Sequence, residues 1–337
     1  MTSIDDRFRL AIIGAGIFAE ANHYPSLSSH ALADLVDRVA VCDLDRGRAE
    51  QMAERYGWQC VYTDAAEMLA RERLDGVIVC VGGPHHPEVA CTVLEAGLPV
   101  FLEKPSSIDL AGTARIAGMA GKRDLAVQVG HQKRHSLAYR RALEIVRDTT
   151  TFGRIVQIES KQHGFPVFPT FFTCMLEWQC HNLDLVRAFC GDIVEIDAKA
   201  HLTDERHGAL TALLRFAGGA VGTLAWGTFG GPGQYAERIE LLGDRNRGVI
   251  VTNAREVTLY EEDTGETWTS DWNPISRNNS HVFNGYVPQL VHFVERVRAG
   301  RQPEPSIHDE LKTMTSLFSI AERAGIPTDW AFISSAP

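Results

Sequence analysis

Three ionisable side chains stand four and three residues apart in one short segment of the chain. Glu177, His181 and Asp184 belong to the stretch EWQCHNLD, which is predicted to open a helix that continues to about Cys190. On a helix, these spacings place all three side chains on one face. One carboxylate could orient the imidazole while its free nitrogen takes a proton from a substrate hydroxyl. The alternative is a hydrogen-bonded histidine of the core.

A second candidate group follows a short, continuously apolar stretch. Glu103, Lys104 and Pro105 come directly after residues 100–102, which are predicted to form a buried strand. Ligands of open α/β sheets bind at the carboxyl ends of such strands. Lys104 could stabilise a developing alkoxide or share its proton there. The alternative is a surface lysine.

A glycine pair near the start of the chain predicts a dinucleotide-binding turn. The apolar residues 10–13 run into Gly14-Ala-Gly16-Ile17-Phe18-Ala19, a Gly-x-Gly-x-x-Ala pattern. The first glycine makes the turn, the second admits a pyrophosphate, and the alanine lets the next helix pack closely. The candidate cofactor-binding residues of this turn are Gly14, Gly16, Ile17, Phe18 and Ala19.

The end of the second predicted strand bears on the choice of dinucleotide. Asp43 is placed to accept hydrogen bonds from the adenosine ribose, and its charge would repel a 2′-phosphate. NAD is therefore favoured over NADP. Arg46 and Arg48 lie close enough in sequence to leave NADP open, although charges at a helix start are usually solvated.

The elements that position these residues indicate two domains. Residues 1–130 alternate short apolar strands with amphipathic helices, which predicts an α/β dinucleotide-binding domain with a doubly wound parallel sheet. The predicted strands are 10–13, 39–42, 77–81, 100–102 and 126–129. The predicted helices are 46–56, 65–71, 87–96 and 109–121.

Residues 131–337 predict an α+β domain for substrate binding and oligomerisation, with a large, open, mostly antiparallel sheet. After a helix at 137–148, the predicted strands are 154–161, 208–216, 220–228, 238–242, 249–251 and 257–260. Helices at 286–299 and 307–324 are expected to pack back on the first domain. Because a large open sheet needs cover on both faces, we expect a homodimer or homotetramer that packs through this sheet.

Composition narrows the class of protein. The 337 residues include 33 Lys and Arg against 43 Asp and Glu, a formal charge of −10, so neither nucleic acid nor a membrane surface is expected as a partner. The seven cysteines lie mostly in apolar stretches, as reduced thiols do. No targeting signal is visible, and we expect a cytoplasmic protein.

Potential metal ligands also gather around His181. They are Cys174, Glu177, Cys180, His181 and Asp184. We favour no metal, because the two cysteines lack the Cys-x-x-Cys spacing of structural zinc. A nicotinamide enzyme with a lysine and a histidine needs no Lewis acid, although a metal-dependent dehydrogenase stays an alternative.

Taken in order, these motifs resemble those of the Gfo/Idh/MocA family of sugar and cyclitol oxidoreductases, over nearly the whole chain. The resemblance rests on the glycine turn, on Glu103-Lys104-Pro105 and on His181-x-x-Asp184. His86, after the strand at 77–81, is also typical of the family. The resemblance implies that Lys104 is the catalytic lysine and His181 the general base, and that His86, Glu103 and Lys104 lie at the cofactor.

The resemblance has one departure. Many relatives have aspartate where this chain has Glu177, so the added methylene moves the carboxylate relative to substrate or lysine.

Residues 132–135, with the sequence QKRH, follow the last strand of the first domain. Lys133 or Arg134 could meet an anionic group of the substrate, or could serve a salt bridge.

The function predicted from these observations is hydride transfer between the nicotinamide of NAD, or of NADP, and a secondary hydroxyl or ketone of a sugar, sugar derivative or cyclitol. Two alternatives remain: a keto-sugar reductase, which could act on a nucleotide sugar, and a non-catalytic dinucleotide sensor. Aromatic and histidine-rich stretches at 163–172 and 272–281 suggest a surface on which a sugar could stack.

Overall fold

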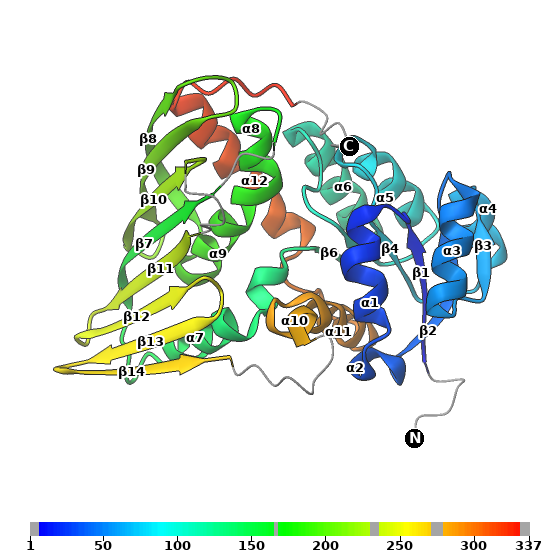
Figure 1. Cartoon of the computed structure of the whole chain (residues 1–337), viewed down its shortest axis with the longest axis horizontal. Helices are drawn as coiled ribbons and strands as arrows, with labels where there is room; N and C mark the ends of the chain where they lie inside the picture. Colours follow the sequence, from blue (N-terminus) through cyan, green and yellow to red (C-terminus); the bar gives the residue numbers. More distant parts are fainter. Residues whose placement is uncertain (1–6, 165–167, 230–235, 271–278, 331–337) are drawn as a thin grey trace. The chain divides into compact units, whose positions relative to one another are not determined.

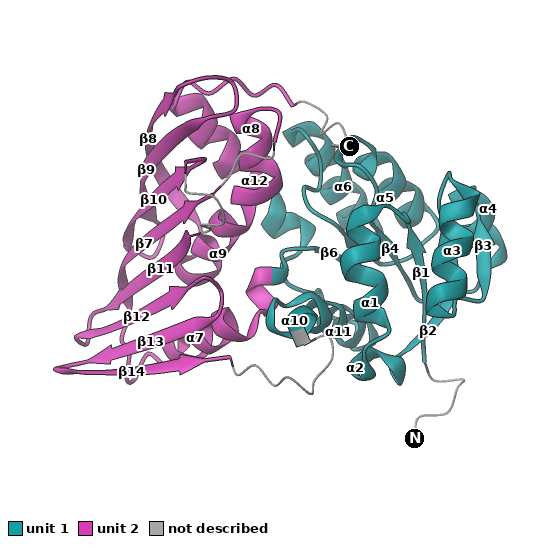
Figure 2. Cartoon of the chain, viewed as in Figure 1, with its two compact units in different colours: residues 1–132, 280–311 teal, residues 133–279, 312–337 magenta. Residues whose placement is uncertain are grey.

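The computed structural model of the chain describes residues 7–164, 168–229, 236–270 and 279–330. The chain divides into two compact units, coloured separately in Figure 2. Unit 1 comprises Met1–Gln132 and Ser280–Leu311, and unit 2 comprises Lys133–Asn279 and Lys312–Pro337. Parts of the two aromatic stretches, residues 165–167 and 272–278, lie outside the described residues.

Unit 1 is built on a six-stranded parallel sheet in the order β3-β2-β1-β4-β5-β6 (Figure 1). The strand order reverses next to β1, so the predicted doubly wound sheet is confirmed. The strands are β1 (Phe8–Ile13), β2 (Val36–Cys42), β3 (Cys60–Tyr62), β4 (Gly76–Val79), β5 (Val100–Leu102) and β6 (Val127–Val129). The helices of this unit include α1 (Tyr24–Leu27), α2 (His30–Ala33), α3 (Arg46–Tyr56), α4 (Ala65–Arg71), α5 (His86–Glu95), α6 (Leu110–Arg123), α10 (Asn279–Phe283) and α11 (Tyr286–Arg298).

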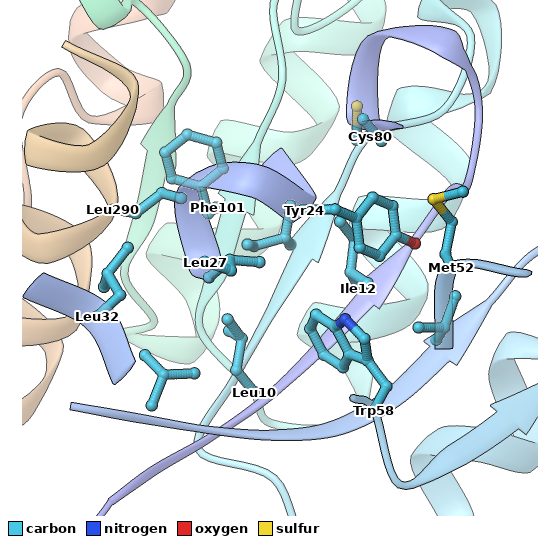
Figure 3. Close-up of a cluster of buried hydrophobic side chains, with 14 of the residues drawn as sticks. Leu10, Ile12, Tyr24, Leu27, Leu32, Met52, Trp58, Cys80, Phe101 and Leu290 are labelled. Atoms are coloured by element: carbon cyan, nitrogen blue, oxygen red, sulfur yellow. The ribbon is translucent and has the colours of Figure 1, made fainter. Parts of the chain in front are cut away.

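The strands of this sheet are apolar on both faces because each face carries its own core. Successive residues of β1 point to opposite sides: Leu10 and Ile12 join one buried cluster, whereas Ala11 and Ile13 join the other. In Figure 3 the first cluster gathers around Tyr24, with Leu290 of α11 packed among its members. Burying each side chain of leucine size stabilises the unit by about 2 kcal/mol.

Unit 2 is built on an eight-stranded sheet in the order β14-β13-β12-β11-β7-β10-β9-β8 (Figure 1). Strands β7 and β10 pair in parallel, and the other neighbours pair antiparallel. The predicted large, mostly antiparallel sheet is confirmed. The strands are β7 (Ile155–His163), β8 (Ile193–Leu202), β9 (Gly208–Phe216), β10 (Val221–Gly227), β11 (Ala236–Gly243), β12 (Arg247–Thr252), β13 (Glu256–Glu261) and β14 (Thr264–Thr269).

One face of the second sheet is covered within unit 2. Residues of β9 alternate between buried and exposed along the whole strand, and Leu210, Leu214 and Phe216 point to the buried face. Helices α7 (Leu137–Arg147), α8 (Phe171–Cys174), α9 (Cys180–Cys190) and α12 (Ile307–Arg323) lie on this side of the sheet (Figure 1). The other face carries partly exposed apolar side chains, among them Leu213 and Val221.

Three strands are absent from the sequence prediction. They are β3, which has three half-buried residues, β8, which forms one edge of the second sheet, and β14, whose six residues are all exposed. An edge strand needs little apolar surface, so its pattern is weak. No helix among the described residues is long and apolar enough to cross a membrane.

Candidate functional site

The turn after β1 requires glycine at its first position. Gly14 has φ +114°, and its amide donates to the carbonyl of Cys42 at 2.8 Å. A Cβ at Gly14 would lie 2.0 Å from the carbonyl oxygen of Cys80, which follows β4. Glycine therefore lets the turn pass directly over the end of the neighbouring strand.

The second glycine of the motif lies in open space. A Cβ at Gly16 would meet no heavy atom within 4 Å, and the next side chain, Ile17, is 81% exposed. Ala19 is buried and begins a π-helix, Ala19–His23. An open turn that leads into a helix leaves room for a pyrophosphate at the helix N-terminus, so these residues fit a dinucleotide.

Asp43 ties the end of β2 to the glycine turn. Its Oδ2 accepts a hydrogen bond from the amide of Ala15 at 2.7 Å, and its Oδ1 accepts one from the amide of Asp45 at 2.8 Å. Arg48 Nη2 also donates to Oδ1 at 3.2 Å. The carboxylate is thus held beside the turn, at the position predicted for the ribose contact.

Lys104 lies at the carboxyl end of β5, within the same unit as the glycine turn. Its Nζ is 5.7 Å from the centre of the Phe18 ring, in the range of a cation–π interaction. His86 begins α5, where its buried Nδ1 lies 2.7 Å from the carbonyl oxygen of Pro105. The structure therefore brings together three predicted elements: the glycine turn, His86 and the segment 103–105.

Glu103 is buried and both of its carboxylate oxygens accept hydrogen bonds from the protein. Oε1 lies 2.9 Å from Nε2 of His23, and Oε2 accepts from the amide of Lys104 at 3.0 Å. Burial by itself raises the pKa of Glu103, but the hydrogen bond and charge of His23 and the charge of Lys104 outweigh it. The net result is a pKa below the ordinary value, and an ionised carboxylate at neutral pH.

The other predicted catalytic residues belong to unit 2. His181 is the second residue of α9 and is 4% exposed. The next residue, Asn182, anchors the helix to the sheet, because its Oδ1 accepts from Ser160 Oγ at 2.8 Å and from Trp226 Nε1 at 2.9 Å. The imidazole thus projects from a helix that is fixed by buried polar contacts on the neighbouring side chain.

Asp184 is engaged by an arginine. Arg134 Nε donates to Oδ2 and Arg134 Nη2 donates to Oδ1, both at 2.7 Å. Both side chains are largely buried, and a two-point contact of this kind fixes their relative orientation. Asp184 therefore holds α9 against the segment after β6.

Glu177 lies on a different kind of helix from His181 and Asp184. A π-helix, Met175–Gln179, precedes α9, and a π-turn contains more residues than an α-turn. The spacing rule for a common helical face was derived for a regular α-helix, so it applies within α9 but not across residues 175–179. Glu177 is half-buried.

A second buried ion pair in unit 2 involves Lys133. Its Nζ donates to Glu237 Oε2, and Tyr139 Oη donates to Glu237 Oε1 at 2.6 Å. Lys133 and Arg134 thus both serve salt bridges within unit 2, one of the two roles open from sequence. The sequence has no local pattern that points to Glu237, Tyr139 or His23, because their contacts join residues far apart in the chain.

Comparisons with known proteins agree with this architecture. Residues 8–131 match a family model described as "Oxidoreductase family, NAD-binding Rossmann fold", and residues 139–248 match the "GFO/IDH/MocA C-terminal domain". The chain is 26% identical over 319 residues to the myo-inositol 2-dehydrogenase of Thermotoga maritima, covering 89% of this chain and 91% of that protein. It is 28% identical over 318 residues to the inositol 2-dehydrogenase of Acidothermus cellulolyticus, covering 90% and 89%.

The fold is also found among solved structures. A dehydrogenase from Chromobacterium violaceum superposes with a TM-score of 0.85 at 20% identity, covering 95% of this chain and 96% of that one. At this identity the likeness shows the fold alone. Together with the two matching family models, the turn, strand order and second sheet described above establish that the chain belongs to the Gfo/Idh/MocA family and is an NAD-dependent oxidoreductase.

Proposed function

We propose that the protein transfers hydride between NAD and a secondary hydroxyl or ketone of a cyclitol, sugar or sugar derivative. The observation that carries this proposal is the position of Lys104 in unit 1, at the carboxyl end of β5 and 5.7 Å from the Phe18 ring of the glycine turn. A dinucleotide on that turn would therefore bind close to a lysine, a group that can stabilise an alkoxide.

Each residue has a separate part in this reaction. His181 takes the proton from the substrate hydroxyl, and the ammonium of Lys104 stabilises the alkoxide that forms. Bound NAD supplies the hydride acceptor. Glu177 adds a negative charge on the turn before His181, whereas Asp184 acts through its two bonds to Arg134, which hold the helix that carries the histidine.

The substrate class is proposed from the relatives. Two proteins that this chain matches over about nine-tenths of its length are named as inositol 2-dehydrogenases. A ring with several secondary hydroxyl groups suits the general-base and alkoxide chemistry proposed for His181 and Lys104. The reverse reaction, reduction of a keto-sugar, uses the same residues with the imidazole as the acid.

The proposed cofactor is NAD in preference to NADP. The carboxylate of Asp43 is fixed at the end of β2, where its charge would repel a 2′-phosphate. The neighbouring arginines are paired with carboxylates: Arg48 with Asp43 and Asp45, and Arg46 with Glu50. Paired in this way, they offer the 2′-phosphate little uncompensated positive charge.

We also propose a homodimer or homotetramer that packs through the uncovered face of the second sheet. Four apolar side chains on this face are more than a third exposed: Leu213, Val221, Leu242 and Tyr260. Charged residues of the same face pair with each other, as Arg215 does with Glu195. A second copy could thus cover the apolar side chains without leaving these charges unpaired.

The same proposal assigns a separate function to each domain. Residues 1–130 bind the dinucleotide, and residues 131–337 bind the substrate and form the oligomer, except for the C-terminal helices at about 286–324, which pack back on the first domain. We propose a cytoplasmic location, because none of the seven cysteines forms a disulfide and five of them are buried.

The experiment that tests the function is nicotinamide absorbance with a panel of inositols, aldoses, sugar acids and amino sugars, with NAD and NADP offered separately. Lys104→Ala and His181→Ala should each lower turnover by about 10²-fold or more, while the dissociation constant for NADH is retained. Exposed residues provide matched controls, Lys122→Ala and His30→Ala, which should keep full activity. Near-normal turnover in either site variant would refute the assignment.

If no polyol reacts although NADH binds, the panel is repeated with ketones. Turnover of a keto-sugar would establish the reductase. A change of oligomeric state on NADH binding, without turnover of any polyol or ketone, would instead establish a dinucleotide sensor.

A further inference from the structure

A histidine that follows the glycine turn is buried in unit 1. His23 is the last residue of the π-helix Ala19–His23, and the amide of Tyr24 closes the π-turn by donating to the carbonyl of Ala19. Single π-turns are rare and often occur at functional sites. The imidazole at the end of this turn is fully buried.

The imidazole of His23 contacts two aromatic rings and one carboxylate. Its ring makes edge contacts with Phe18 and Phe101, at centroid distances of 6.0 and 5.5 Å. Nε2 lies 2.9 Å from Glu103 Oε1, whereas Nδ1 is buried and has no hydrogen-bond partner among the described residues. A proton on Nδ1 would be a buried donor without an acceptor, so the proton belongs on Nε2, which donates to Glu103.

Glu103 contacts both His23 and Lys104. Its second oxygen accepts from the amide of Lys104 at 3.0 Å, and the positive charge of Lys104 acts on its carboxylate. The carboxylate packs against Gly130, where a Cβ would lie 2.7 Å from Oε1, so glycine leaves the space that Glu103 occupies. Another titratable neighbour is Cys80, a thiol whose pKa is raised well above its ordinary value by burial and by the charge of Glu103, and which therefore stays neutral.

These contacts connect four residues to one another: Phe18, His23, Glu103 and Lys104. Phe18 touches His23 and lies under the Lys104 ammonium, and Glu103 binds His23 and the Lys104 backbone. We propose that His23 is a positioning residue that fixes the ionised Glu103 beside Lys104 and thereby sets the charge and orientation of the lysine. This inference rests on the proposed function only in assigning Lys104 a part in the reaction.

The first test measures the proton on His23 without any substrate. In protein with ¹⁵N-labelled histidine, the signal that disappears in His23→Gln identifies this residue among the thirteen histidines. The signal should show a proton on Nε2, the nitrogen that lies 2.9 Å from Glu103 Oε1. An imidazole protonated on Nδ1 alone would overturn the proposal.

The second test measures the reactivity of Lys104 with a small amine reagent by mass spectrometry. The exposed Lys122 in the same sample is the internal control. His23→Phe keeps an aromatic ring but removes the donor, so Glu103 loses its main stabilising contact and Lys104 loses charge stabilisation. Lys104 should then react about tenfold faster, and Glu103→Gln should have the same effect.

If His23 acts on Lys104 through Glu103, the effects of His23→Phe and Glu103→Gln on the reactivity of Lys104 should not add. His23→Phe combined with Glu103→Gln should give no further increase over either variant. His23→Gln, which keeps an amide donor near the position of Nε2, should remain near the wild-type value. Additive effects of the two changes, or an unchanged Lys104 in both single variants, would refute the coupling.

The kinetic consequence separates this inference from the proposed function. With an active polyol substrate, His23→Phe should lower kcat about tenfold and shift its pH profile, with little change in the dissociation constant for NADH. If wild-type protein turns over no substrate, the proposed function fails, whereas the tautomer and the lysine reactivity still decide the role of His23.

Discussion

The two glycines of the dinucleotide turn should respond to the same substitution in opposite ways. In Gly14→Ala, the new Cβ would lie 2.0 Å from the Cys80 carbonyl oxygen, and the backbone would keep φ +114°. In Gly16→Ala, the new methyl group would meet no protein atom within 4 Å. The first change therefore affects folding, and the second affects the ligand.

The magnitudes follow from these geometries. A positive φ at a residue with a Cβ costs about 1–3 kcal/mol, and overpacking against a backbone atom adds about 1–3 kcal/mol. Gly14→Ala should thus lower the free energy of unfolding by about 4 kcal/mol, or Tm by about 10 °C. Gly16→Ala should change the free energy of unfolding by less than about 0.5 kcal/mol.

Gly16→Ala, which should leave the free energy of unfolding nearly unchanged, should weaken the binding of NADH. If the pyrophosphate binds at this turn as proposed, a methyl group at Gly16 would push it away, and losing a charge-assisted hydrogen bond would raise the dissociation constant about 10- to 100-fold. The assays are urea denaturation and NADH fluorescence titration. Gly118→Ala, at a position of α6 that also lies in open space, is the control and should leave NADH binding unchanged.

Two results would refute the reasoning. Wild-type NADH affinity in Gly16→Ala would mean that the pyrophosphate does not bind at this turn. Wild-type stability in Gly14→Ala would mean that the backbone of the turn is not confined by the end of β4.

Three further predictions concern charge and association. Arg134→Ala leaves Asp184 buried without its two donors and should lower the free energy of unfolding by about 3 kcal/mol, measured in urea; adding Asp184→Asn should restore part of the loss, and no recovery would argue against the pair. Because the folded-state pKa of Glu103 is depressed, its contribution to stability is present above the unfolded-state pKa and is lost as the pH falls through the folded-state value. The stability difference between wild type and His23→Phe should therefore shrink in acid; a difference that persists in acid would exclude ionised Glu103 as its source. Leu213→Arg should convert the proposed oligomer to a smaller species by light scattering, and an unchanged mass would exclude this face.

Local patterns predict those elements whose ends are set by local chemistry. The helices predicted over 46–56 and 65–71 have the bounds found in the structure. In both, an aspartate accepts from the amide of the third helical residue, Asp45 from Arg48 and Asp64 from Glu67. The strand predicted over 208–216 also has the observed bounds, because every second side chain enters the core.

The candidate site is predictable only where one segment supplies the chemistry. The glycine turn, Asp43 and Lys104 follow from strand ends, which the apolar pattern identifies. The partner of Asp184 lies 50 residues away in the chain, and that of Glu103 lies 80 residues away. A spacing rule cannot find either pair, because each contact depends on how separate elements pack.

The two π-helices are the features that periodicity is least able to reveal. Each adds a residue to a helical turn, one directly after the glycine turn and one directly before α9. A pattern of 3.6 residues per turn averages over such an insertion, yet the insertion changes the direction of every side chain on one side of it. In unit 1, His23 is the last residue of such a turn and lies 2.9 Å from Glu103. A buried hydrogen bond to a charged group stabilises a fold by about 1.5–3 kcal/mol, so the contact between His23 and Glu103 helps to hold the helix in this irregular form.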